Sequence, residues 1–172
     1  ASDTPGVGDP AIPAPVDNGT FFSLAAWRPP SYNEANVSDK PAWVKAQPLI
    51  SQSTSVFHDN TRIKQIESLQ AVDRAVERIV NALNDTGQLD NTIIVFTSDN
   101  GYLWGEHRWL DSKWAVYEES IRVPLMVRGP DIVPHTEDRL MMNIDFAPTF
   151  AEFAGAIPPK VDGLSAVGLL KD

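Results

Sequence analysis

The fold is decided by residues 91–101, which read NTIIVFTSDNG. Thr92 to Phe96 form a nearly continuous apolar run, rich in β-branched residues, without the polar alternation of a half-exposed strand. Such a run is typical of a strand that is covered on both faces in a parallel sheet. It ends at the turn-forming residues 98–101. We therefore expect an α/β fold in which this buried strand leads into a loop.

Two oxygen-bearing side chains, Asp99 and Asn100, come directly after this strand. Ligands of open α/β sheets bind beyond the carboxyl ends of the strands. A carboxylate and an amide carbonyl are hard oxygen donors, which suit calcium or magnesium. Taken alone, the short motif favours an ordinary Asx turn over a metal site, because motifs of this length recur by chance.

The residues after the turn favour the metal site over the ordinary Asx turn. Residues 102–130 read YLWGEHRWLDSKWAVYEESIRVPLMVRGP. A Gly-Glu-His segment, a lysine and a Tyr-Glu-Glu-Ser-Ile-Arg-Val-Pro stretch come one after another in this order, and the set resembles the sulfatases of the alkaline-phosphatase-like superfamily. The resemblance continues to the end of the chain and is weaker over residues 1–50. It implies a partial alkaline-phosphatase-like fold, with a mainly parallel sheet flanked by helices.

The resemblance also implies roles for individual residues. Asp99 and Asn100 match the second pair of calcium ligands of the family, and Lys113 matches the lysine that contacts a sulfate oxygen. An ammonium group, with a compact charge and three donors, suits such a contact. His107 of the Gly-Glu-His segment either contacts substrate or packs the loop. Without the family, Lys113 would be read as a surface lysine paired with Asp111 or Glu118.

Two expected parts of a sulfatase site do not occur in this sequence. The family's nucleophile is a formylglycine made in a Cys/Ser-x-Pro-Ser-Arg motif, and the chain has neither this motif nor any cysteine. The family's first metal-ligand pair, two adjacent aspartates, does not occur either. We therefore expect residues 1–172 to be the carboxyl-terminal portion of a catalytic domain whose amino-terminal half is missing, and to be inactive alone. Residues 1–57 should be irregular and Pro-rich, and residues 58–172 a helix–strand core with a site loop at 97–113.

Three functions remain open at this point. The first is a sulfatase part that hydrolyses sulfate esters with calcium and a formylglycine supplied from outside this chain. The second is a phosphonate or phosphodiester hydrolase of the same superfamily. Those enzymes tend to carry Asp-His where this chain has Asp99 and Asn100, which favours the sulfatase. The third is a non-catalytic binding domain derived from that fold.

Composition limits the partners. The net charge of −9 argues against nucleic acid as a partner. No apolar run approaches the length of a membrane span. Residues 1–15 lack a signal-peptide pattern. The sequence therefore leaves the compartment of the parent protein open, with the periplasm, the extracellular space and a lysosome-like compartment as the alternatives. Strands without their sheet neighbours would expose apolar surface, so we also expect self-association.

Periodicity predicts further elements. Apolar residues recur at helical spacing over 61–85, which predicts a long helix that buries this stripe and ends at Gly87. Residues 122–128 predict a second buried strand beside the first. Asp145 and Gly155 frame a further helix. His58, just before the long helix, is interpreted as structural and is left outside the site.

Overall fold

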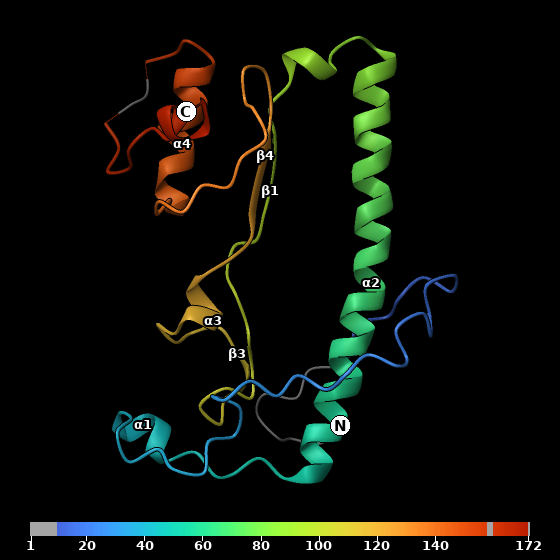
Figure 1. Cartoon of the computed structure of the whole chain (residues 1–172), viewed down its shortest axis with the longest axis vertical. Coiled ribbons are helices and arrows are strands. Elements are labelled where there is room, and N and C mark those ends of the chain that lie inside the picture. Colours follow the sequence, from blue (N-terminus) through green and yellow to red (C-terminus); the bar gives the residue numbers. More distant parts are fainter. Residues whose placement is uncertain (1–9, 158–159, 172) are drawn as a thin grey trace. The chain divides into compact units, whose positions relative to one another are not determined.

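The computed structural model describes residues 10–157 and 160–171. The chain divides into two compact units. Unit 1 contains the described residues up to 82 together with residues 100–123, and unit 2 contains residues 83–99 with the described residues from 124 onward. The elements, labelled in Figure 1 where there is room, are α1 (Ala42–Lys45), α2 (Gln52–Asp85), η1 (Leu89–Asn91), β1 (Ile94–Thr97), β2 (Leu103–Trp104), β3 (Leu110–Ser112), α3 (Glu118–Ile121), β4 (Leu125–Arg128), η2 (Asn143–Asp145), α4 (Phe146–Phe153) and α5 (Val167–Lys171).

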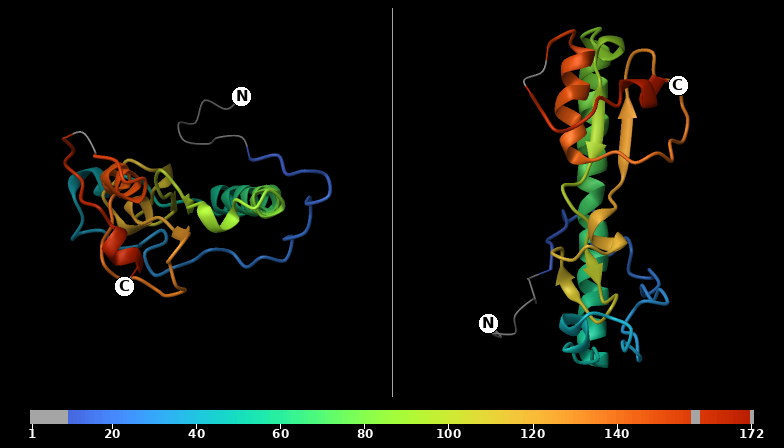
Figure 2. Two further views of the ribbon diagram at one scale, coloured as in Figure 1. Left: turned by 90° about the horizontal axis from the view of Figure 1, so that it is seen from above. Right: turned by 90° about the vertical axis from the view of Figure 1, so that its left-hand side faces the viewer.

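The predicted long helix is α2, a single unbroken helix in every view (Figures 1 and 2). Its carboxyl end agrees with the prediction. Gly87 adopts φ +67° and donates its N–H to the carbonyl of Asn84 at 3.0 Å, while the N–H of Gln88 reaches the carbonyl of Leu83 at 2.8 Å. These two bonds form a Schellman motif, which requires the left-handed conformation that glycine adopts without strain.

The amino end of α2 lies at Gln52 rather than at residue 61. Ser51 provides the cap, because its Oγ accepts the N–H of Thr54 at 3.1 Å. Asp59 lies inside the helix and forms a two-pronged ion pair with Arg28, with distances of 2.7 and 2.8 Å. The prediction that residues up to 57 are irregular is therefore wrong for residues 52–57 and for α1.

The expected burial of the apolar stripe of α2 is also wrong for this chain. Leu69, Val72 and Ile79 are 55%, 42% and 56% exposed. The buried residues of α2 are polar: His58, Thr61 and Glu67. In the described part of the chain, α2 is held by polar contacts rather than by its stripe.

Several of those contacts join α2 to the irregular segment before α1. The buried carboxylate of Glu67 accepts the backbone N–H of Gly19 at 2.8 Å and binds Lys64 at 2.8 Å. Arg74 makes two hydrogen bonds to the buried carboxylate of Asp17, at 2.7 and 2.5 Å. These partners lower the pKa of both carboxyl groups, Asp17 chiefly through Arg74 and Glu67 chiefly through Lys64.

The two predicted strands are neighbours, as expected, but the expected parallel direction is wrong. β1 and β4 form a two-stranded antiparallel sheet in which Val95 lies opposite Val127. A parallel return needs a crossover that is usually helical, and the intervening residues contain only the four-residue helix α3. Cover on both faces is also wrong for this chain, since Phe96 and Met126 are 36% and 58% exposed.

Unit 2 also contains the predicted helix between Asp145 and Gly155, which is α4. Asp145 is buried, and its carboxylate accepts the N–H groups of Met142 at 2.8 Å and Leu164 at 2.9 Å. A Cβ at Gly163 would lie 2.1 Å from the carbonyl oxygen of Ile144, so only glycine fits there. The segment that contains Gly163 and Leu164 therefore packs closely against the start of α4.

Within residues 10–157 and 160–171, no helix combines the length and the hydropathy that a membrane crossing requires.

Candidate functional site

The segment predicted to carry the site folds mainly within unit 1. β2 and β3 pair antiparallel, and Glu106 forms a β-bridge with Tyr32. Gly101 donates its N–H to the carbonyl of Ser120 at 2.8 Å. A Cβ at this glycine would meet the carbonyl oxygen of Glu119 at 2.0 Å. The chain just after the Asp-Asn pair is therefore fixed against α3, and only glycine allows this close approach.

The predicted metal ligands stand at the end of β1. Asp99 is exposed, and its backbone carbonyl accepts the side-chain amide of Asn143 at 3.4 Å. Asn100 is half-buried, and its amide nitrogen lies 2.8 Å from the carbonyl of Gly101. The chemistry of the two side chains fits a hard cation, since both carry oxygen donors. No group of three or more His, Cys, Asp or Glu in the described part of the chain is placed to hold a metal, and a calcium-binding role of the pair stays a prediction.

Lys113 lies immediately after β3 and is exposed. The two acidic residues considered as its surface partners have other contacts. Asp111 accepts a hydrogen bond from Tyr102 at 2.6 Å, and Glu118 lies 3.7 Å from Arg122. The next residue, Trp114, is 88% exposed. The ammonium group of Lys113 is thus presented on an open surface of unit 1.

His107 occupies a packed position. Its ring stacks on Tyr117 with 3.9 Å between centroids and a 28° interplanar angle. Nδ1 lies 3.0 Å from a carboxylate oxygen of Glu34, and the backbone N–H donates to the carbonyl of Ser31 at 2.8 Å. These contacts match the loop-packing alternative, and a substrate contact stays a prediction.

Arg108 holds the turn that contains His107 against residues 34–47. Its guanidinium donates to three backbone carbonyls, those of Glu34 at 2.8 Å, Ala35 at 2.9 Å and Gln47 at 3.0 Å. Both His107 and Arg108 have positive φ, +54° and +63°, which is uncommon for residues other than glycine. The loop is thus held in a strained conformation by its surroundings.

A buried cluster of His58, Asp111 and Tyr102 lies near this loop and was not predicted from the sequence. His58 is 3% exposed, and its Nδ1 lies 3.4 Å from the Oδ1 of Asp111. The same oxygen accepts the hydroxyl of Tyr102, and burial together with this carboxylate raises the pKa of Tyr102. The buried ring of His58 thus packs beside the strand before Lys113, and its structural role stays a prediction. Sequence separation hides this contact, since 52 positions lie between His58 and Asp111.

Glu106 is the buried anchor of the loop, with 1% of its surface exposed. Oε1 accepts the indole N–H of Trp27 at 2.5 Å, and Oε2 accepts the backbone N–H of Trp104 at 2.6 Å. One carboxylate therefore sets the position of two tryptophans from distant parts of the sequence. Nothing in the local pattern around Trp27 indicated this partnership.

Comparison with known proteins decides the family. Residues 26–156 match the family described as Sulfatase. The chain belongs to the sulfatase family. An arylsulfatase from Volvox carteri is 37% identical over 155 residues, which are 86% of this chain and 24% of the relative. The chain therefore spans about a quarter of the length of this curated relative.

Solved structures agree with this assignment. A protein solved in complex with its substrate D-glucosamine-2-N,6-O-disulfate is 39% identical, with a TM-score of 0.64, over 70% of this chain and 25% of that protein. A phosphonate monoester hydrolase from Silicibacter pomeroyi is 27% identical, also with a TM-score of 0.64, over 96% of this chain and 32% of that protein. The sulfatase-like architecture predicted from the sequence is thus confirmed in this coarse sense.

Proposed function

We propose that this sulfatase chain is the carboxyl-terminal portion of a catalytic domain that hydrolyses sulfate esters. The observation that carries the proposal is the family match over residues 26–156. This range includes the Asp-Asn pair and Lys113, in the order that the family resemblance predicts. The chain alone is expected to be inactive, because no residue in its sequence stands in a formylglycine motif.

Within this proposal, Asp99 and Asn100 supply oxygen ligands to calcium, with magnesium as the second choice. The bound cation would neutralise charge on the sulfate group. Lys113 donates a hydrogen bond to a sulfate oxygen from its exposed position after β3. The nucleophile and the remaining metal ligands come from outside this chain.

The buried network beneath Lys113 supports its assigned role. Asp111 holds a left-handed conformation, with φ +54°, two residues before the lysine. The hydroxyl of Tyr102 donates a hydrogen bond to the carboxylate of Asp111 at 2.6 Å, and the buried ring of His58 from α2 packs 3.4 Å from the same carboxylate. A lysine that must meet a sulfate oxygen benefits from such a rigid support.

A second candidate is phosphonate monoester hydrolysis, which is favoured by the likeness to the hydrolase from Silicibacter pomeroyi. Sulfate and phosphonate monoesters present similar oxygens to a cation and a lysine. Both groups carry a single negative charge at neutral pH, so the two proposals differ in the atom that is attacked, sulfur or phosphorus, and in the preferred substrate.

The test uses the longer protein that contains this chain. We expect its kcat/KM on 4-nitrophenyl sulfate to exceed that on a 4-nitrophenyl phosphonate monoester. The reverse order would select the phosphonate hydrolase, and no turnover of either ester would favour a non-catalytic binding domain.

Calcium titration of the isolated chain forms the second arm. We expect weak binding that Asp99→Ala abolishes, and tight binding unaffected by Asp99→Ala would mean that the metal site lies elsewhere.

A further inference from the structure

Lys113 follows a short stretch of backbone with an uncommon conformation. Asp111, two residues before the lysine, has φ +54°, in the left-handed region that residues other than glycine seldom adopt. Between them lies Ser112, which is buried and pairs with Leu103 of β2. The side chain of Lys113 itself is exposed. The direction in which its ammonium group points therefore depends on the conformation that the chain holds at Asp111.

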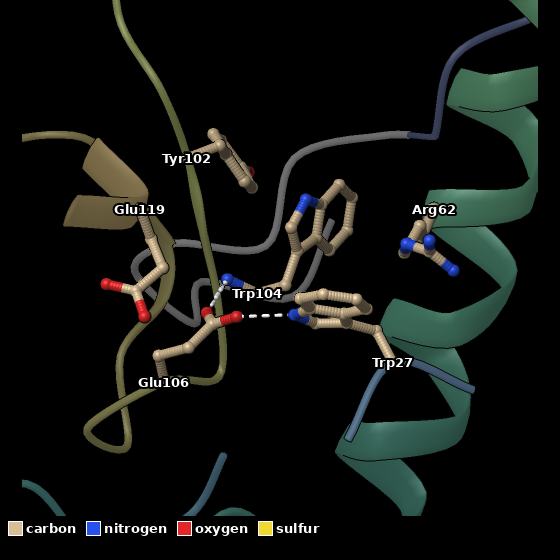
Figure 3. A pocket seen from close by; sticks show the side chains of 6 residues that line it. All are labelled: Trp27, Arg62, Tyr102, Trp104, Glu106 and Glu119. Atoms are coloured by element: carbon tan, nitrogen blue, oxygen red, sulfur yellow. Dashed lines mark hydrogen bonds between the residues drawn. The ribbon is translucent and has the colours of Figure 1, made fainter. Parts of the chain in front are cut away.

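Tyr102, just before β2, is held by its backbone and by its ring. Its backbone N–H donates to the carbonyl of Glu119 at 2.7 Å, and the N–H of Gly101 donates to the carbonyl of Ser120 at 2.8 Å. Its ring packs beside that of Trp104, with 4.9 Å between the centroids and an interplanar angle of 54° (Figure 3). The hydroxyl group of Tyr102 therefore has a defined position.

A hydrogen bond joins Tyr102 to Asp111. The hydroxyl donates to Oδ1 of Asp111 at 2.6 Å, and the side chain of Asp111 is only 10% exposed. Oδ2 of Asp111 is buried and has no donor among the residues that the structure describes. The ring of His58 lies 3.4 Å from Oδ1 without forming a hydrogen bond to it. Within the described part of the chain, the tyrosine hydroxyl is therefore the group that keeps this carboxylate hydrogen-bonded.

Loss of this hydroxyl would act on the backbone before Lys113. The carboxylate of Asp111 would be buried without a hydrogen bond, which is costly, so the side chain would turn toward water. The left-handed conformation is itself unfavourable for aspartate and persists only while the surroundings hold it. Both effects would release the chain at Asp111 and displace the ammonium group of the lysine.

We propose that Tyr102 is a positioning residue for Lys113, an inference that rests on the proposed sulfatase function. Tyr102 acts through Asp111. Its hydroxyl holds the carboxylate, the carboxylate holds the left-handed backbone, and this backbone directs the lysine toward the sulfate oxygen. The rate in a preorganised site depends steeply on such placement, since a displacement of about 1 Å can cost about 100-fold. In this role Tyr102 influences the rate without touching the substrate.

The test is a double-mutant cycle in the longer protein that contains this chain. The values of kcat and KM on 4-nitrophenyl sulfate are measured with calcium for wild type, Tyr102→Phe, Lys113→Ala and the double variant. We expect Tyr102→Phe to lower kcat about tenfold or more, with KM little changed. In the Lys113→Ala background, Tyr102→Phe should lower kcat no further, because the tyrosine acts through the lysine. A general loss of stability would instead lower activity in both backgrounds.

Two controls separate positioning from a general loss of structure. Tyr32→Phe removes another hydroxyl of unit 1 that is hydrogen-bonded at 2.7 Å, to Ser55, and should leave kcat unchanged. Asp111→Asn keeps an acceptor oxygen for Tyr102 and tolerates the left-handed conformation, so it should retain more turnover than Asp111→Ala, which loses both.

Hydrogen exchange of the isolated chain forms a second arm that needs no activity. Tyr102→Phe should speed amide exchange at residues 110–113 about tenfold, and Tyr32→Phe should not. Unchanged exchange there in Tyr102→Phe, or the same proportional loss of kcat in both backgrounds, would overturn the inference. Loss of turnover in Lys113→Ala but not in Tyr102→Phe would sink the positioning role and leave the sulfatase proposal standing. Faster exchange in Tyr102→Phe, with no sulfate-ester turnover by the longer protein, would support the hold on Asp111 and reject the sulfatase proposal.

Discussion

Glu106→Gln tests how the loop around the candidate site is held. The glutamate side chain is 1% exposed, and each of its two oxygens accepts one N–H, from the indole of Trp27 and from the backbone of Trp104. Glutamine keeps one acceptor oxygen and turns an amide N–H₂ toward the second donor. One buried donor then loses its partner, which costs about 1–3 kcal/mol. We therefore expect the free energy of unfolding of unit 1 to fall by about 2 kcal/mol.

Tryptophan fluorescence measures this change in unit 1 specifically. All five tryptophans of the chain, at positions 27, 43, 104, 109 and 114, lie in unit 1. The urea midpoint should fall by about 1 M if the urea dependence is ordinary for a small protein. The control is Glu118→Gln, whose side chain is 72% exposed beside Arg122 and which should change stability by less than about 0.5 kcal/mol. Equal midpoints for the two variants would refute the anchoring role of Glu106.

Three further predictions concern acid stability, close packing and association. Asp17 and Glu67 have lowered pKa values in the fold, so their stabilisation is complete above the ordinary values of 3.8 and 4.5 and is lost as the pH falls through the lowered ones. The fluorescence-detected stability should therefore drop below about pH 4.5 and drop less in the Asp17→Asn, Glu67→Gln variant, and equal slopes would contradict this. Gly163→Ala should destabilise unit 2 by about 1–3 kcal/mol in hydrogen exchange, because its Cβ would meet the carbonyl of Ile144. Gly168→Ala, with open space around the new Cβ, should not destabilise it. Equal hydrogen exchange in the two variants would refute the packing argument. The exposed apolar residues of α2 should make the isolated chain sediment as an oligomer, and a monomer at high concentration would count against this.

Local chemistry explains which parts of the fold were predictable from the sequence. The end of α2 was predictable from Gly87, since a left-handed residue after a helix has a recognisable signal. Its start was missed because Ser51 caps the helix ahead of the apolar periodicity. The direction of β4 was predicted wrongly, because a continuous apolar run is typical of a parallel sheet but also forms the antiparallel pair of β1 and β4.

The candidate site was predictable only in part. Asp99, Asn100 and Lys113 emerged because their order along the chain carries the family signal, and their roles stay proposals. The hydrogen bond between Trp27 and Glu106 was not predicted, since 78 positions lie between these residues and only the fold brings them together. Contacts between distant residues leave no periodic pattern in the sequence.

Lys113 is central to the proposed chemistry, and a kinetic comparison tests its role. In the longer protein that contains this chain, kcat on a chromogenic sulfate ester is measured with calcium for wild type, Lys113→Ala and Lys45→Ala. Lys45 is an exposed lysine of α1 and serves as the matched control. We predict that Lys113→Ala lowers kcat by about 100-fold or more, as loss of one charge-stabilising donor does elsewhere, and that Lys45→Ala leaves it unchanged. Equal turnover in all three proteins would contradict the assignment of Lys113 to the sulfate contact.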